Sequence, residues 1–245
     1  SSSDACLALP RAGLSDCYTE AARTYIQSRG GVVEFGRRVE SLIVRDGVCD
    51  GVRFVDGSLS EDKAVISAVP WHEIVRILPS ELLRAEPYFT NILSLRPAPI
   101  ISITIWFDRA ITDLEFAGMR GTTIQWLFNR AKITASGGHS YSLVLSGAHQ
   151  HIARSKDELL KVALDDLAQL FPEARTAQVL HSLVIKERFA TFSPAVGIDA
   201  LRPAAESPVR GFTLAGDWTA TGLPATIEGA VQSGYTAAKR LLDQN

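Results

Sequence analysis

The chain has 245 residues, of which 46% are hydrophobic and 21% charged, and its formal net charge at pH 7 is -2. This length and composition are ordinary for a globular protein built as one large domain or two modest ones. The charge gives no electrostatic basis for binding nucleic acid, and no apolar run reaches the roughly 18 residues of a membrane-spanning helix.

The first part of the chain predicts one helix and a short strand. Ser15 is a good N-cap for a helix that runs to about Ser28, where Gly30-Gly31 ends it. The apolar face of this helix is expected to carry Ala21, Ala22, Tyr25 and Ile26. Residues 32–35 predict a short strand.

A three-stranded β-meander is expected next. Asp-Gly pairs at 46–47 and 56–57 fit hairpin turns. They lie between β-rich runs at 38–45, 51–55 and 63–69, and the last run leads into Pro70.

The middle of the chain predicts an antiparallel sheet with helices on one side. Two short helices are expected between 71 and 93, followed by a half-buried strand at 101–107, where isoleucines alternate with Ser102, Thr104 and Trp106. Further strands at 123–128, 141–145 and 179–189 and an amphipathic helix at 156–171 complete this region.

The C-terminal stretch predicts a strand, a glycine turn and a helix. A brief apolar run at 212–214 precedes Gly216-Asp217, and Pro224 suits the first position of a helix. The apolar face of this helix is expected to carry residues 227, 230, 231, 234, 237, 238, 241 and 242. Gly229 and Gly234 inside it indicate the close approach of another backbone or of a flat ligand. The pattern alone fits a terminal helix packed tightly on a sheet equally well.

The same stretch has the features of a ligand site. Asp217 follows the strand at its carboxyl end, where open α/β sheets usually meet ligands. The dipole and the free N–H groups at the start of the next helix favour a negative partner.

This stretch resembles the C-terminal flavin-binding signature of the amine oxidase and phytoene desaturase superfamily. The resemblance is carried by Ala215-Gly216-Asp217-Trp218 and by the run from 223 to 234. It is strongest to the squalene-associated FAD-dependent enzymes, the hydroxysqualene dehydroxylases. The resemblance implies FAD as the cofactor, with Asp217 on a ribityl hydroxyl beside Gly216. The segment implied to lie against the flavin is Pro224, Ala225, Thr226 and Ile227.

A second block of the chain resembles the same superfamily. It comprises the first helix, the Gly-Gly pair, the meander and the run that ends in Pro70. The resemblance implies that the backbone at Val39 pairs with the adenine of FAD and that Pro70 walls the cofactor. Taken alone, Val39 fits a core residue as well.

The glycine turn that grips the pyrophosphate in such flavoproteins is absent from the sequence. No two glycines lie two positions apart, so the chain contains no G-x-G-x-x-G. We therefore expect a fragment that holds FAD poorly by itself, or one chain of a split enzyme whose other half is a separate polypeptide.

The resemblance also implies a polyisoprenoid substrate. Trp106, Trp126, Phe128 and Phe192 are candidates to line its tunnel, although each fits a core aromatic as well. Arg11 lies in a loop that approaches the substrate side of the flavin in similar enzymes, and it is a candidate to bind a hydroxyl or a second cofactor. No residue is assigned a catalytic role.

The cysteines and histidines indicate neither a disulfide framework nor a metal site. Three cysteines cannot all pair, and neither their spacing nor His149-x-His151 supplies the ligands of a metal ion. The N-terminus has no signal-peptide pattern. We expect a cytoplasmic protein, with peripheral membrane association to reach a lipid substrate.

Together these observations predict a mixed α/β and α+β chain. Residues 1–70 and 196–245 are expected to belong to an incomplete FAD-binding domain, and residues 71–195 to the substrate domain. The reaction expected of the complete enzyme is reduction of hydroxysqualene to squalene. Carotenoid desaturation, amine oxidation and a cofactor-free lipid-binding module are the alternatives.

Overall fold

The computed structural model describes residues 9–62, 64–134 and 137–244. The described chain packs as two compact units, each with its own hydrophobic core. The first unit contains the residues up to Val33 together with Pro99–Arg188, and the second contains Glu34–Ala98 and the residues from Phe189 onward. The functional division expected at residues 70 and 195 stays a prediction.

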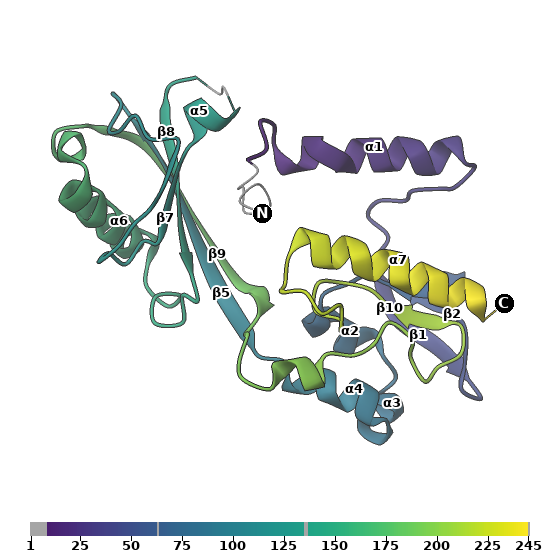
Figure 1. Ribbon diagram of the computed structural model, residues 1–245. Helices are drawn as coiled ribbons and strands as arrows, with labels where there is room; N and C mark the ends of the chain where they lie inside the picture. The colour runs from purple at the N-terminus through teal and green to yellow at the C-terminus, as the bar shows by residue number, and fades with distance from the viewer. Residues whose placement is uncertain (1–8, 63, 135–136, 245) are drawn as a thin grey trace, which may run out of the picture. The chain divides into compact units, whose positions relative to one another are not determined.

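In the first unit, helix α1 comprises Leu14–Ser28 (Figure 1). Its N-cap is Gly13, because the Gly13 carbonyl accepts hydrogen bonds from the amides of Asp16 and Cys17 at 2.9 and 3.2 Å. The expectation that Ser15 caps the helix is therefore wrong by two residues. Three large apolar side chains of α1 are exposed: Tyr18 by 49%, Tyr25 by 59% and Ile26 by 42%.

The strand expected at 32–35 is absent. This segment has no regular secondary structure, and Val32 and Phe35 are 80% and 76% exposed. A strand needs a hydrogen-bonding neighbour, and no strand of the described chain pairs with these residues.

The core of the first unit lies between a five-stranded sheet and helix α6 (Lys156–Leu170) (Figure 1). The strand order is β6-β7-β8-β5-β9. The strands are β5 (Pro97–Phe107), β6 (Phe116–Gly118), β7 (Trp126–Asn129), β8 (His139–Ser146) and β9 (Val179–Phe192). As predicted, the odd-numbered isoleucines of β5 pack under α6. Ser155 and Glu158 form a capping box that fixes the start of α6.

Two details of this sheet differ from expectation. Strand β7 begins at Trp126 rather than at 123, because hydrogen bonds to the side chains of Thr122 and Asp166 hold Ile124 in a loop. The short helix α5 (Arg130–Thr134) lies between β7 and β8, where the sequence predicted only a turn.

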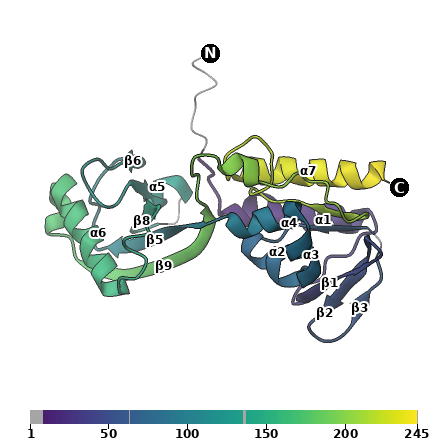
Figure 2. The ribbon, with the colours of Figure 1, turned by 90° about the horizontal axis from the view of Figure 1, so that it is seen from below.

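In the second unit, β1 (Val39–Arg45), β2 (Val48–Phe54) and β3 (Leu59–Ser60) form the antiparallel meander (Figure 2). The Asp46-Gly47 turn is confirmed, and both residues have positive φ, at 50° and 74°. The expected third strand at 63–69 is wrong. Strand β4 (Val65–Ser67) leaves the meander and pairs in parallel with β10 (Phe212–Leu214).

Short helices between β4 and β5, and a 3-10 turn before β10, contribute side chains to the core of this unit. They are α2 (Trp71–Ile77), α3 (Ser80–Ala85) and α4 (Pro87–Thr90), with 3-10 turns η2 (Asn91–Ser94) and η4 (Ile198–Leu201); η3 (Pro172–Arg175) belongs to the first unit. The two helices expected between 71 and 93 are confirmed, and α4 adds a third.

Helix α7 (Ile227–Asp243) follows β10. The prediction that Pro224 starts it is wrong, because Thr226 has extended backbone angles and is the N-cap. The apolar face expected for α7 divides in two. Of the expected residues, Ala237 and Leu241 are buried, whereas Ile227, Val231 and Leu242 are exposed. Gly234 has open space where a Cβ would lie, so the close approach expected there is not present.

Candidate functional site

The turn after β10 requires glycine at position 216. Gly216 has φ of +138°, and a Cβ there would collide with the indole of Trp218. Its N–H donates to the Ser233 hydroxyl of α7 at 2.7 Å. This hydrogen bond connects the end of β10 to the middle of α7 and fixes the backbone that leads into Asp217.

Asp217 lies at a small cavity of about 190 Å³. The other residues that line it are Ala68, Pro70, Trp71, Phe189, Ala190, Gly216, Trp218 and Ala230. The Trp218 indole is 1% exposed and donates to the main-chain oxygen of Val69 at 3.1 Å. The predicted site residues Pro70, Gly216 and Asp217 therefore meet at one place, where β4 and β10 both end.

Burial raises the pKa of the Asp217 carboxyl above its ordinary value. The main-chain amides of Asp217 and Trp218 and the positive charge of Arg202 partly offset this effect. Within the described residues, no side chain donates a hydrogen bond to this carboxylate. It is therefore free to accept one from a ligand hydroxyl.

A second and larger cavity, of about 440 Å³, lies at the loop before α7. Its lining includes the predicted residues Phe192, Pro224 and Ala225. The remaining lining residues are Thr191, Pro194, Ala195, Ile198, Asp199, Arg202, Gly222 and Leu223. Most of these side chains are apolar, so this cavity suits a hydrophobic group.

Arg202 is a residue that the sequence did not single out, and it holds the loop between the two cavities. Its side chain is 3% exposed. Nη1 donates to the Leu223 carbonyl at 2.8 Å and to Asp199 Oδ1 at 3.0 Å. Nη2 donates to the Asp217 carbonyl at 3.0 Å and to the Thr221 hydroxyl at 3.3 Å. The one signal in the sequence is a charged residue between Leu201 and Pro203.

The start of α7 presents free donors. The Thr226 hydroxyl accepts from the amide of Gly229 at 3.1 Å. The amides of Ile227 and Glu228 have no partner in the part of the chain that the structure describes. Together with the helix dipole, these two N–H groups favour a ligand atom that carries negative charge.

The other predicted residues lie elsewhere. Val39 begins β1, where the register with β2 is irregular, and it lines neither cavity. Arg11, in the first unit, donates to Glu115 Oε1 at 2.5 Å and to the Lys132 carbonyl at 2.9 Å. These contacts occupy its guanidinium.

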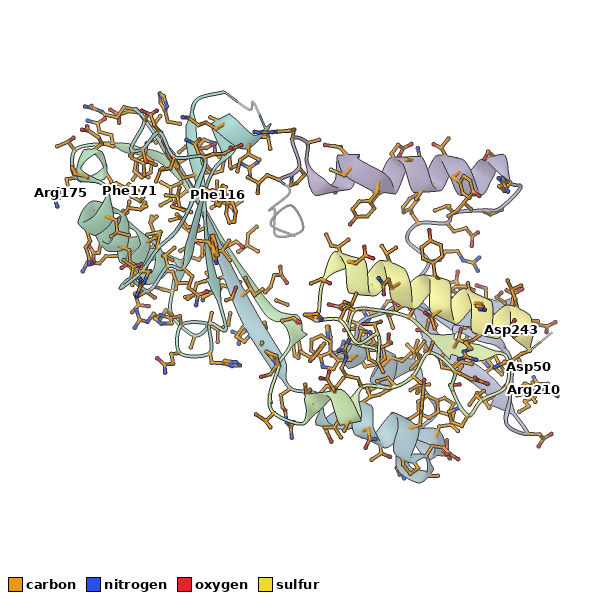
Figure 3. All side chains as sticks on the ribbon, in the orientation of Figure 1. Asp50, Phe116, Phe171, Arg175, Arg210 and Asp243 are labelled. Carbon is orange, nitrogen blue, oxygen red and sulfur yellow. The ribbon has the colours of Figure 1, made fainter. Side chains whose placement is uncertain are left out.

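Three of the four predicted tunnel aromatics lie in the first unit, on the sheet face opposite α6. Phe116, Phe128 and Trp126 stack in a row, with ring centroids 6.5 and 6.1 Å apart; Phe116 is labelled on this sheet in Figure 3. Trp106 packs against His181 at 5.1 Å. Phe192 belongs to the second unit, where it is 4% exposed.

Neither a membrane-spanning helix nor a metal cluster is found in the described residues. No helix in residues 9–62, 64–134 and 137–244 has both the length and the hydropathy needed to cross a bilayer. Within the same ranges, no group of three or more His, Cys, Asp or Glu side chains is arranged to hold a metal ion.

The parallel strand pair, the glycine turn with its acid and the helix start are the elements for which the sequence resemblance implies flavin binding. The family described as flavin containing amine oxidoreductase matches residues 3–242, and the chain belongs to it.

Sequence relatives support this assignment, and solved structures share the fold. The chain is 32% identical over 244 residues to hydroxysqualene dehydroxylase of Rhodopseudomonas palustris, covering 96% of the chain and 52% of that protein. It is 29% identical over 241 residues to 15-cis-phytoene desaturase of Glycine max, and this match covers 90% of the chain and 41% of that protein.

The structure of reduced UDP-galactopyranose mutase has a similar fold, with a TM-score of 0.73 and 13% sequence identity. The match covers 97% of this chain and 52% of that one. The structure of an oxidoreductase from Methanosarcina mazei is also similar, with a TM-score of 0.70 and 19% sequence identity. The match covers 90% of this chain and 53% of that one.

The chain thus spans about half the length of the curated relatives that it matches. Asp217 offers a hydrogen-bond acceptor, and the amides of Ile227 and Glu228 offer donors, to a ligand at this end of the strand pair. The sequence contains no G-x-G-x-x-G turn to hold a pyrophosphate.

Proposed function

We propose that this chain is the flavin-ring and substrate half of an FAD-dependent oxidoreductase that converts hydroxysqualene to squalene. The observation that carries the proposal is the meeting of Gly216, Asp217 and Pro70 at the common end of β4 and β10. A half-buried carboxylate without a side-chain partner is suited to bind a hydroxyl group, and open α/β sheets bind ligands at this end.

FAD, when bound, supplies hydride chemistry that no side chain of this chain provides. The chain's own residues hold and orient it. Asp217 accepts a hydrogen bond from a ribityl hydroxyl. The amides of Ile227 and Glu228 donate to the pyrimidine edge of the ring, where negative charge develops on reduction. Arg202 fixes the loop that connects these two contacts.

The substrate proposal rests on apolar surface at two places. In the second unit, the 440 Å³ cavity at Pro224 and Ala225 is lined mostly by apolar side chains. In the first unit, the row of Phe116, Phe128 and Trp126 offers flat apolar faces for an isoprenoid chain. The relatives named for hydroxysqualene and phytoene support a polyisoprenoid. Because such a substrate is carried in membranes, we place the complete enzyme at the cytoplasmic face of one.

A carotenoid desaturase uses the same site with electrons moving from substrate to flavin, and an amine oxidase uses it on a different substrate. A cofactor-free lipid-binding module is the alternative favoured by the absent glycine turn. Bound flavin decides against the module, and product analysis separates the enzymes.

The test uses a chimera in which the part of the Rhodopseudomonas palustris relative that this chain does not cover, called here the complementing half, is joined to this chain. We expect flavin absorbance bands in the chimera and none in the chain alone. With the flavin reduced under anaerobic conditions, we expect the chimera to form squalene from hydroxysqualene. A chimera that is folded and flavin-free contradicts the flavin proposal. A flavin-loaded chimera that acts on phytoene or an amine but not on hydroxysqualene contradicts the substrate proposal.

A further inference from the structure

The sheet of the first unit carries aromatic rings and hydroxyl groups together on the face opposite α6. The odd-numbered residues of β5 and β8 lie in the core under α6, as do Leu127 of β7 and Val184 of β9. Because side chains alternate along a strand, the even-numbered residues of β5, β7 and β8 form the opposite face, called here the mixed face. These residues are Ser102, Thr104, Trp106, Trp126, Phe128, Ser140, Ser142 and Val144.

Two hydroxyl groups meet at the centre of the mixed face. Thr104 Oγ1 and Ser142 Oγ lie 3.2 Å apart, within hydrogen-bonding distance. They come from adjacent strands, because Thr104 lies directly opposite Ser142 in the antiparallel pairing of β5 with β8. Ser142 in turn lies opposite Phe128, and Phe128 lies opposite Phe116 of β6. One line across the sheet is therefore made of two aromatic rings followed by two hydroxyl groups.

Strand β9 supplies apolar side chains on the other side of this hydroxyl pair. It is the neighbour of β5 in the sheet. Val184 of β9 belongs to the core, so the adjacent Leu183 and Ile185 lie on the mixed face. Both are 44% exposed. The hydroxyl pair thus has aromatic rings toward β6 and aliphatic side chains toward β9.

The mixed face differs from an ordinary solvent-facing or packing surface. The solvated face of an antiparallel sheet carries polar side chains, whereas here large apolar groups flank the hydroxyl pair, and Thr104 is only 9% exposed. A surface that packs against another apolar layer would not carry the pair either, because burying a hydroxyl group without a partner costs free energy. The combination favours a ligand that is apolar with a polar group inside it.

The hydroxyl pair has an unused donor. Two hydroxyl groups contribute two O–H donors and several lone pairs. Their mutual hydrogen bond uses one O–H, and within the described residues neither side chain makes another hydrogen bond. The pair can therefore donate one hydrogen bond and accept others. An alcohol matches it because its hydroxyl group also donates and accepts, whereas a hydrocarbon would leave the free O–H unpaired.

We propose that Thr104 and Ser142 bind the hydroxyl group of an isoprenoid alcohol and thereby set a preference for the alcohol over a hydrocarbon. The apolar chain on one side of that hydroxyl lies along Phe128 and Trp126, and the chain on the other side lies toward β9. A few polar groups within an apolar site fix the orientation and the specificity of a ligand. A site built to bind a substrate hydroxyl rejects the analogue that lacks it.

The inference rests on the proposed function for the class of substrate and adds the contact that recognises it. The hydroxyl group distinguishes hydroxysqualene from phytoene, which is a hydrocarbon. It also distinguishes hydroxysqualene from squalene, so the pair favours the substrate over the product. All of these contacts belong to the first unit, so binding can be measured without flavin.

The experiment titrates the purified chain with farnesol and with farnesene, a hydrocarbon of the same isoprenoid skeleton, and follows tryptophan fluorescence. Trp126 is 40% exposed on the mixed face, so its emission reports a ligand there. We expect the Kd of farnesol to be lower than that of farnesene by about fivefold or more. Trp126→Phe should remove most of the fluorescence change.

Two variants test the hydroxyl pair. Thr104→Val and Ser142→Ala each remove one hydroxyl group, and each should raise the Kd of farnesol to that of farnesene, while the Kd of farnesene changes by less than about twofold. Thr176→Val is the matched control, because Thr176 belongs to the same unit but is exposed at the end of η3, outside the mixed face. It should keep the preference for farnesol. Circular dichroism shows that each variant is folded.

Three outcomes overturn the inference. They are equal binding of the two ligands by the wild-type chain, equal loss of the preference with Thr176→Val, and equal weakening of both ligands by Thr104→Val, which would mean that Thr104 acts through packing alone. Tighter binding of farnesal, the corresponding aldehyde, than of farnesol would contradict the assignment to an alcohol.

The chimera separates this inference from the proposed function. In the flavin-loaded chimera, Thr104→Val should raise the KM for hydroxysqualene by about fivefold or more. A farnesol preference that depends on the pair, together with a chimera that forms no squalene, would support the hydroxyl site and contradict the proposed function. Squalene formation that Thr104→Val does not affect would contradict the hydroxyl site and support the proposed function.

Discussion

The guanidinium of Arg202 donates to the main-chain oxygen of Leu223 at 2.8 Å, while its other terminal nitrogen donates to the main-chain oxygen of Asp217 at 3.0 Å. One buried side chain thus spans the loop that separates the carboxylate from the helix start. The contact with Asp199 adds little, because the Asp199 side chain is 85% exposed. The carbonyl contacts position the loop.

Arg202→Met should destabilise the chain by about 3 kcal/mol, because it leaves the Asp217 and Leu223 carbonyls without their charged donor. Arg202→Lys keeps the charge but loses the planar fork, so it should recover only part of this stability. Hydrogen exchange gives the specific readout. Amides of residues 219–225 should exchange faster in Arg202→Lys than in wild type, whereas those of α6 should not change. Equal acceleration in both regions would mean that Arg202 acts on global stability alone.

Asp217→Asn should make the chain more stable and the complete enzyme a weaker flavin binder. Burial raises the pKa of Asp217 in the fold, so folding favours the neutral acid. The stability that this group contributes is full below its ordinary unfolded-state pKa of about 3.9 and is lost as the pH rises through the folded value. Asparagine does not ionise, so it does not lose this stability as the pH rises. The melting temperature of Asp217→Asn should exceed that of wild type at pH 7 by less than about 4 °C, and the two should converge toward pH 3.

The control for this prediction is Asp56→Asn. Asp56 is exposed, and hydrogen bonds from Ser58 lower its pKa, so the pH dependence has the opposite sign. Its contribution is present above the unfolded pKa and is lost as the pH falls. Asp56→Asn should therefore be no more stable than wild type at pH 7. A parallel response of the two variants would contradict the assignment of the Asp217 effect to burial.

The elements that the sequence predicts correctly are those whose signals are local. The alternating isoleucines of β5, the amphipathic helix α6 and the Asp46-Gly47 turn are predicted from neighbouring residues, and the structure confirms them. Gly216 and Asp217 are recognisable because a strand, a glycine and an acid are adjacent in the chain.

The errors arise where the partner lies far along the chain. The sequence favours placing β4 in the meander because Val65 follows it directly, whereas its partner Phe212 is supplied by the C-terminal strand. Arg202 gives little signal because the two acceptors that position the loop are the main-chain oxygens of Leu223 and Asp217, and any residue type can supply a main-chain oxygen. The start of α7 is misplaced when the Pro224 preference is weighed above the Thr226 hydroxyl that caps Gly229.

Gly216→Ala should destabilise the chain more than Gly57→Ala. Both glycines have positive φ, at 138° and 84°, so both substitutions carry backbone strain of about 1–3 kcal/mol. Only at Gly216 does the new methyl group also collide with the Trp218 indole, which is held by its bond to Val69. Urea unfolding of both variants measures the difference. Equal losses would show that the indole moves away at no cost, and the cavity at Asp217 would then not depend on this glycine.

The two glycines of α7 should respond to alanine in opposite directions. At Gly234 no atom lies within 4 Å of the place that a Cβ would take, so Gly234→Ala should stabilise the isolated chain by about 0.5–1 kcal/mol through helix propensity. At Gly229 the new methyl group would lie 3.0 Å from the Pro224 carbonyl oxygen, so Gly229→Ala should give no such gain and should disturb the loop before the helix. Thermal unfolding of the chain alone measures both effects. Equal changes in stability for the two variants would mean that the space around each Cβ position does not decide the effect.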